Sequence, residues 1–196
     1  TGEIISNRGA EVIAEAKSKA RLLAKQRRQG LGSSGAPSAL IQHFPASRFR
    51  GKQIAGYWPL KGEMDIRPLL SALSDLGFAV SLPCITGPSR PLIFRKWGQG
   101  DEMRAGHFKV QEPHAHQEEI TPEFVLMPLL AFTADGKRLG YGGGYYDRTL
   151  AKLRAEGDVF ACGVAYAGQE VPELPTDEHD QPLDGILTEQ FFRTFA

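Results

Sequence analysis

A glycine-rich segment flanked by charged side chains is the part of the sequence best suited to chemistry. It reads RLGYGGGYYDR over residues 138–148, and four of the five residues from 140 to 144 are glycine. Glycine lets the backbone approach a ligand closely and adopt positive φ angles. Where such a loop leads into a helix, its amides and the helix N-terminus together bind anions. Arg138 adds positive charge before the loop, and Asp147 places a carboxylate where Mg²⁺ can bind beside a phosphate.

This segment matches neither of the two common nucleotide loops. The chain contains no GxxxxGK[ST] run, and Tyr145 occupies the place of the last glycine of GxGxxG. The alternative interpretation is a tight strand-to-helix turn above a packed aromatic pair. Four glycines exceed what such a turn needs, so the sequence favours phosphate binding.

Charge is concentrated in two distant segments of opposite sign. Residues 16–30 carry six basic side chains and no acid, whereas residues 168–190 carry seven acids and no Lys or Arg. Spacings of four, four and three residues place the following side chains in one stripe along a helix: Lys17, Arg21, Lys25 and Arg28. The two segments could be solvated faces, or two halves of one site for a polyanion and its metal. The pattern alone leaves both interpretations open.

The elements that must position these groups alternate between helix and strand. The predicted helices span 6–30 (beginning at a cap on Ser6 or Asn7), 66–76 and 145–156. The predicted strands are 53–60, 78–82, 91–97, 123–132, 158–166 and 185–192. Residues 30–38 are predicted as a loop, and 98–122 as a polar loop region around a short strand near Phe108. This order predicts one three-layer α/β/α domain over residues 1–196, with a mainly parallel sheet.

Composition excludes several classes of protein. The 196 residues include 23 basic and 23 acidic side chains, and a net charge of zero argues against a nucleic-acid coat protein. No apolar stretch approaches the roughly 20 residues of a membrane span, and the first residues lack the apolar core of a signal peptide. Three of the five histidines lie in 98–122, where a solvated loop is favoured over a metal site. We expect a cytoplasmic monomer that binds neither nucleic acid nor membrane.

The run MPLLAFTADGKRLGYGGGYYDRTL (127–150) closely resembles the signature of the 5-formyltetrahydrofolate cyclo-ligase family. Four further pieces occur in the family's order and at similar spacing: AKSKARLLAKQRR, YWPLKGEMD, FKVQEP and HDQPLDGILTE. The resemblance implies a fold like that of sugar-phosphate isomerases and CoA-transferases. It also implies ATP- and Mg²⁺-dependent closure of 5-formyltetrahydrofolate to 5,10-methenyltetrahydrofolate, with release of ADP and phosphate.

The resemblance also assigns roles to individual residues. Arg138 and Asp147 match catalytic positions, and Asp147 and Asp180 match the Mg²⁺ ligands. The positions that match ATP-binding residues are Lys17, Arg21, Arg138, Leu139, Gly140, Tyr141, Gly142, Gly143, Gly144, Tyr145 and Tyr146. Those expected to bind the folate are Trp58, Glu63, Phe108, Tyr141 and Tyr145. By pattern alone, Trp58 could equally be a core residue, and Glu63 and Asp180 exposed surface acids.

The chain departs from the family at a few positions. Many members carry Asp where this chain has Thr133, and some carry basic residues in the loop at Tyr141 and Gly143. Thr133 therefore receives no catalytic role, and phosphate neutralisation is expected to rest on Lys17, Arg21 and Arg138. Two other functions stay open: a folate- or nucleotide-binding protein without catalysis, and an ATP-independent sugar-phosphate isomerase. Retention of the charged site positions argues against both.

Overall fold

The computed structural model describes residues 2–32 and 35–195. Its helices are α1 (Gly2–Gln29), α2 (Ala36–His43), α3 (Arg67–Asp75) and α4 (Tyr145–Glu156), with short 3-10 turns η1 (Ala46–Phe49), η2 (His107–Lys109) and η3 (Ala167–Gln169). The central strands are β1 (Ile54–Ala55), β2 (Val80–Cys84), β3 (Ile93–Lys96), β6 (Phe124–Pro128), β9 (Phe160–Val164), β10 (Gly185–Leu187) and β11 (Phe192–Thr194). Two separate hairpins pair β4 (Met103–Ala105) with β5 (Gln111–Pro113), and β7 (Ala131–Phe132) with β8 (Arg138–Leu139).

The seven-stranded central sheet has the order β11-β10-β9-β6-β1-β2-β3. The five inner strands run parallel, and only the edge strands β3 and β11 are antiparallel to their neighbours. This confirms the predicted α/β fold with a mainly parallel sheet. The strand order reverses between β1 and β6, because the chain builds β2 on one side of β1 and β6 on the other. Ligands of such sheets bind beyond the carboxyl ends of the strands at this reversal.

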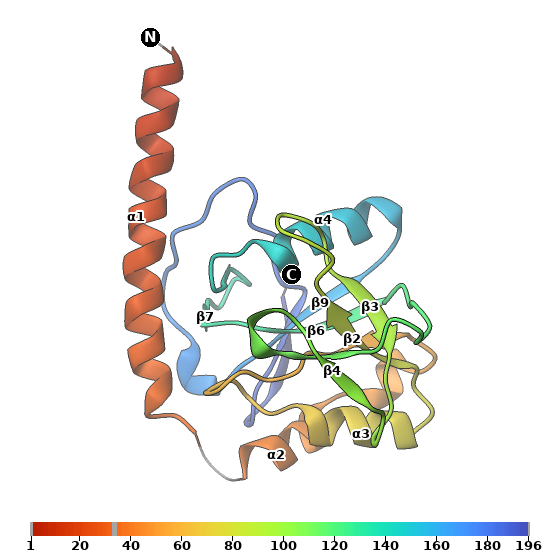
Figure 1. Cartoon of the computed structure of the whole chain (residues 1–196). Helices are drawn as coiled ribbons and strands as arrows, with labels where there is room; N and C mark the ends of the chain where they lie inside the picture. The colour runs from red at the N-terminus through yellow and green to blue at the C-terminus, as the bar shows by residue number, and fades with distance from the viewer. Residues whose placement is uncertain (1, 33–34, 196) are drawn as a thin grey trace.

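Helices cover both faces of the sheet, with α2 and α3 on one side and α4 on the other (Figure 1). The strand β6 shows why both faces need a cover, since Phe124 and Leu126 pack into one core and Val125 and Met127 into the other. All four side chains are fully buried. A strand buried on both faces reads as a continuous apolar run, which is how residues 124–127 appear in the sequence.

Helix α1 lies along one flank of the molecule, and its N-terminal part extends away from the body (Figure 1). Its buried Ala24 packs against the β7–β8 hairpin at Leu130, Ala131 and Leu139. That hairpin leads directly into the glycine-rich segment, so α1 is anchored beside it. None of the helices in the described part of the chain is long and apolar enough to span a membrane.

Several predicted boundaries differ from the structure. Helix α1 begins at Gly2, so the cap predicted at Ser6 or Asn7 is wrong. The predicted loop 30–38 contains the start of α2, because Ala36 and Leu40 are buried against the core and make a short helix favourable. Residues 33 and 34 of that predicted loop lie outside the described residues.

Most of the predicted strands are shorter than expected. The short strand predicted near Phe108 is found as the pair β4 and β5 on either side of it, whereas residues 107–109 form the turn η2, and Phe108 itself has φ 56°. The predicted strand 123–132 divides into β6 and β7, and 185–192 ends at Leu187 before the chain turns back as β11. Only Ile54 and Ala55 of the strand predicted over 53–60 pair with neighbours, because the chain then leaves the sheet to form a loop.

Candidate active site

Three loops meet at the carboxyl edge of the sheet where the strand order reverses. One follows β1 and contains Glu63, one follows β6 and contains the glycine-rich segment, and one follows β9 and contains the acidic residues. Because β1, β6 and β9 are parallel, these loops leave the sheet at the same edge. Helix α1 supplies the fourth part through Lys17, Arg21 and Arg28, whereas Lys25 of the predicted stripe is exposed.

The glycine loop, residues 140–144, leaves room for guanidinium groups. A Cβ at Gly142 would lie 3.2 Å from the Arg21 Cζ, and one at Gly144 only 2.5 Å from the Arg148 Nη1. Both glycines also have positive φ angles, +102° and +68°, which side chains other than glycine rarely adopt. Arg21 Nε donates a hydrogen bond to the Gly140 carbonyl at 3.1 Å. The glycines of this loop therefore provide positive φ angles and also leave space for the arginine side chains.

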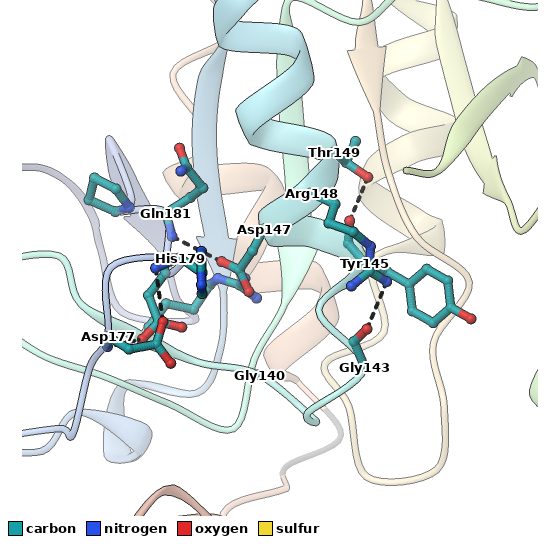
Figure 2. A network of polar contacts seen from close by, with 12 residues as sticks. Gly140, Gly143, Tyr145, Asp147, Arg148, Thr149, Asp177, His179 and Gln181 are labelled. Atoms are coloured by element: carbon teal, nitrogen blue, oxygen red, sulfur yellow. Dashed lines mark hydrogen bonds and ion pairs between the residues drawn. The ribbon is translucent and has the colours of Figure 1, made fainter. Parts of the chain in front are cut away.

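Arg138 and Asp147 connect the two ends of the glycine loop. The Arg138 Nη2 donates to the Asp147 Oδ1 at 2.8 Å, and the guanidinium also lies against Gly140, whose Cβ would be 3.1 Å from Nη1. The same Asp147 oxygen accepts the Gln181 backbone N–H at 3.0 Å, so Asp147 points to the acidic segment (Figure 2). The covered Arg138 Nε has no acceptor among the described residues. This arginine thus keeps a donor to spare.

The basic helix and the acidic segment meet at Lys17. Its Nζ donates to the Asp177 Oδ2 and the Asp180 Oδ2, both at 2.6 Å, across about 160 residues of sequence. Burial opposes the ammonium charge, but the two carboxylates outweigh it and raise the pKa of Lys17. The hydrogen bond from Lys17 lowers the pKa of Asp177. The two charged segments therefore meet in the fold through a partly buried ion pair.

The predicted Mg²⁺ ligands lie close together in the chain's fold. Asp147 is bonded to the N–H of Gln181, the residue that follows Asp180. Within residues 2–32 and 35–195, no three His, Cys, Asp or Glu side chains gather closely enough to hold a metal alone. Mg²⁺ commonly takes one or two carboxylates and completes its shell with waters and substrate phosphates. Asp147 and Asp180, two acids beside the glycine loop, are compatible with that requirement.

Among the described residues, one carboxylate oxygen of Glu63 lacks a hydrogen bond of good geometry, although the Tyr141 hydroxyl lies close to the carboxylate. Its Oε2 accepts the Leu60 N–H at 2.7 Å, whereas the buried Oε1 has no donor among the described residues. Burial raises the pKa of Glu63, although the Leu60 N–H and the neighbouring Tyr141 and Arg28 side chains oppose that rise. Arg28 in turn donates a hydrogen bond to the Tyr141 hydroxyl. The Glu63 carboxylate is therefore only partly hydrogen-bonded within the described part of the chain.

The predicted aromatic residues separate into two places. Phe108 at the tip of the β4–β5 hairpin meets Tyr145 edge to face, with ring centroids 6.4 Å apart, and is 70% exposed. Trp58 instead lies under the Arg67 guanidinium, 5.2 Å from its ring, and lines a hollow of about 530 Å³ with Trp97. None of the residues that line this hollow belongs to the glycine loop. The structure therefore brings Phe108, but not Trp58, to Tyr145.

The other predicted residues have mainly supporting positions. Leu139 is buried against α1, Tyr146 faces the Arg138 guanidinium with its centroid at 6.0 Å, and Gly143 lies against the Tyr145 ring. Burial raises the pKa of Tyr146. The Thr133 Oγ1 accepts the Lys137 N–H at 3.0 Å, so this residue stabilises the β7–β8 turn.

Three residues near the site were not predicted from the sequence: Asp177, Arg28 as a partner of Tyr141, and Arg148. Asp177 lies three residues before Asp180 in the acidic segment. This closeness in sequence could have indicated that Asp177 lies near the site. Arg148 directly follows Asp147 at the helix start, but nothing in the pattern indicates that its side chain folds back to the glycine loop.

Comparisons with known proteins agree with this geometry. The sequence profile described as the 5-formyltetrahydrofolate cyclo-ligase family matches residues 16–189. A Haemophilus influenzae protein named 5-formyltetrahydrofolate cyclo-ligase is 33% identical over 143 residues, covering 70% of this chain and 76% of the relative. The Escherichia coli K12 protein of the same name is 29% identical and covers 88% of this chain and 95% of its own. The NMR structure of Aquifex aeolicus 5,10-methenyltetrahydrofolate synthetase superimposes on this chain with a TM-score of 0.74 at 28% identity. The match covers 91% of this chain and 92% of that structure.

Proposed function

The chain belongs to the 5-formyltetrahydrofolate cyclo-ligase family and is an enzyme of that type. From this premise we propose that it cyclises 5-formyltetrahydrofolate to 5,10-methenyltetrahydrofolate with Mg²⁺ and ATP. The observation that carries the ATP and Mg²⁺ assignment is the contact between the basic helix and the acidic segment beside the glycine loop. Lys17 bonds to Asp180, and Arg138 bonds to Asp147, within one edge of the sheet. This arrangement supports a site in which cations bind a triphosphate and nearby carboxylates bind Mg²⁺.

The chemistry needs alignment more than a protein nucleophile. A formamide is a poor electrophile and its oxygen a poor leaving group. In the proposed reaction the formyl oxygen attacks the γ-phosphorus of ATP, and ADP leaves. The second folate nitrogen then attacks the formyl carbon and the ring closes. The C–O bond breaks, and phosphate leaves together with the proton that this nitrogen carried. The phosphate therefore carries away the formyl oxygen.

The residues at the glycine loop support these steps electrostatically. Arg138 and Arg21 are proposed to hold the triphosphate, because phosphoryl transfer depends mainly on positioning and charge stabilisation. Asp147 and Asp180 would hold Mg²⁺, which supplies neutralisation of the phosphate oxygens. Glu63, with its unpartnered Oε1, is proposed to orient the folate, and Phe108 and Tyr145 to contact its flat apolar surface. Because the site draws on elements from α1 to the segment before β10, we propose that the chain works as one catalytic domain.

An oxygen-labelling experiment tests this proposal. 5-Formyltetrahydrofolate labelled with ¹⁸O in the formyl group is incubated with the protein, Mg²⁺ and ATP in unlabelled water. The proposal predicts that one ¹⁸O atom appears in each released phosphate, as measured by mass spectrometry. Label that is lost to water, or phosphate that carries none, would contradict phosphorylation of the formyl oxygen.

Variants test the assigned residues in the same assay. Arg138→Ala and Asp147→Ala are each expected to lower turnover by orders of magnitude, because each removes one member of the pair that joins the two ends of the loop. Lys152→Gln, on an exposed position of α4, serves as the control and should retain wild-type turnover. Wild-type turnover in either alanine variant would overturn the assignment of that residue.

A further inference from the structure

The cations around the glycine loop fall into two classes. Lys17 and Arg138 are each bonded to carboxylates, at 2.6 Å and 2.8 Å. Arg21 and Arg148 are bonded only to backbone carbonyls of the loop, among the residues whose side chains the structure describes. A cation already paired with an acid contributes less net charge to an incoming anion. The positive charge at the loop that no carboxylate pairs with in the described part of the chain therefore comes from Arg21 and Arg148, together with Arg28, which donates to the Tyr141 hydroxyl.

Arg21 and Arg148 bond to opposite ends of the loop. Arg21 Nε donates to the Gly140 carbonyl at 3.1 Å, and Arg148 Nη2 donates to the Gly143 carbonyl at 2.8 Å. Figure 2 shows Arg148 reaching Gly143 on one side of the start of α4, while Asp147 faces Gln181 on the other. The cation and the carboxylate are thus separated although they are adjacent in sequence.

Arg148 has donors that no described residue uses. A guanidinium carries five N–H donors, and among the described residues Arg148 donates from its side chain only to Gly143. Its Nε is covered and finds no acceptor in that part of the chain. The Tyr145 ring lies below the guanidinium, 5.0 Å from centroid to Cζ, and restricts its orientation. The side chain is therefore held in place with donors to spare.

Gly144 is shaped to admit this arginine. A Cβ at position 144 would lie 2.5 Å from the Arg148 Nη1, closer than real Cβ contacts occur. The glycine thus lets the guanidinium approach the N-terminal end of α4, where backbone amides also favour an anion. Cation, amides and glycine loop converge on the same place.

We propose that Arg148 is an additional ATP-binding residue, which contacts the triphosphate at the opposite end of the glycine loop from Arg21. This inference rests on the proposed function, and it adds a residue that lies outside the run from Arg138 to Tyr146. It also supplies the positive charge that this loop lacks at Tyr141 and Gly143. The group that Arg148 would bind is an anionic oxygen. A carboxylate of the folate could supply such an oxygen in place of the triphosphate.

Equilibrium binding of each substrate separately tests the proposal. Arg148→Gln is compared with wild type for Mg²⁺-ATP and for 5-formyltetrahydrofolate, and Lys152→Gln removes the same charge one turn further along α4. Arg148→Gln is expected to weaken ATP binding about tenfold or more, the size expected for one charge-assisted hydrogen bond. Folate affinity should stay within about twofold of wild type, as should ATP affinity in Lys152→Gln.

Two further readouts separate a direct contact from a structural role. Arg148→Lys should recover part of the lost ATP affinity, because it restores the charge without the fork-like geometry. Added salt should weaken ATP binding less steeply in Arg148→Gln than in wild type, because one screened charge contact is missing. Thermal unfolding of each variant checks that the fold is retained.

The proposal is overturned if Arg148→Gln binds ATP within about twofold of wild type, or if Lys152→Gln loses as much affinity. Loss of folate affinity alone would assign Arg148 to the folate carboxylate instead. A wild-type protein that binds ATP but forms no methenyl product would refute the proposed function while leaving the Arg148 comparison valid. A wild-type protein that binds no ATP would refute both.

Discussion

Glu63→Gln is expected to stabilise the fold while abolishing most of the activity. The wild-type carboxylate has one buried oxygen, Oε1, with no donor in the described part of the chain, and burial raises its pKa above the ordinary 4.5. Burying a charged group with incomplete hydrogen bonding opposes folding. Glutamine keeps an oxygen for the Leu60 N–H and replaces the charged carboxylate by a neutral amide, so we expect a gain of about 1 kcal/mol from removal of the buried charge. For a chain of this size each kcal/mol raises Tm by roughly 2–4 °C.

The sign of the pH dependence makes this prediction specific. A raised pKa means that the folded state binds the proton more tightly, so Glu63 favours folding below pH 4.5 and loses that contribution as pH rises through its folded pKa. The advantage of Glu63→Gln should therefore be larger at pH 7 than at pH 4. Thermal unfolding at both pH values measures it, with the exposed Glu102→Gln as the control. A lower Tm for Glu63→Gln, or an equal gain at both pH values, would refute the reasoning.

Three further predictions concern the loop, the ion pair and the folate surface. Gly144→Ala should destabilise the protein by about 1–2 kcal/mol in chemical denaturation, because φ at this residue is positive and the Arg148 guanidinium occupies the space of a Cβ. The control Gly157→Ala has open space around its Cβ and should not destabilise the protein. Equal effects of the two substitutions would contradict this. Because Lys17 lowers the pKa of Asp177, the stabilising contribution of Asp177 is present above pH 3.8 and is lost as pH falls further. Asp177→Asn should therefore flatten the acid side of the curve of stability against pH, and an unchanged curve would contradict this. Phe108→Ala should leave Tm unchanged, since the ring is 70% exposed, but weaken folate binding about tenfold in a titration; unaltered folate affinity would remove Phe108 from the site.

The fold was largely predictable because its signals are local. The apolar run of β6 and the glycines before α4 mark a buried strand and a helix start directly in the sequence. Helix α2 escaped prediction because its first residues follow a glycine- and serine-rich stretch, and only packing of Leu40 against the core makes them helical. The length of each strand depended on which neighbours it meets, and this information is not local.

The candidate site was predictable in its parts but not in its pairings. The spacing of Lys17 and Arg21 indicated one helix face, yet nothing in it indicated that Lys17 reaches Asp177 and Asp180 about 160 residues away. The contact of Arg148 with the glycine loop was equally unpredictable, although the two are close in sequence. It depends on the side-chain rotamer of Arg148 and not on its place in the sequence. Pairings of this kind follow from tertiary packing, which the sequence specifies only through the complete fold.

We propose that this chain closes the folate ring with consumption of ATP. The most direct measurement follows the absorbance band of methenyltetrahydrofolate after protein is mixed with 5-formyltetrahydrofolate and Mg²⁺, with and without ATP. The account predicts growth of the band only when ATP is present, matched by release of one phosphate for each product formed. Growth of the band without ATP, or binding of both ligands with no growth at all, would contradict it.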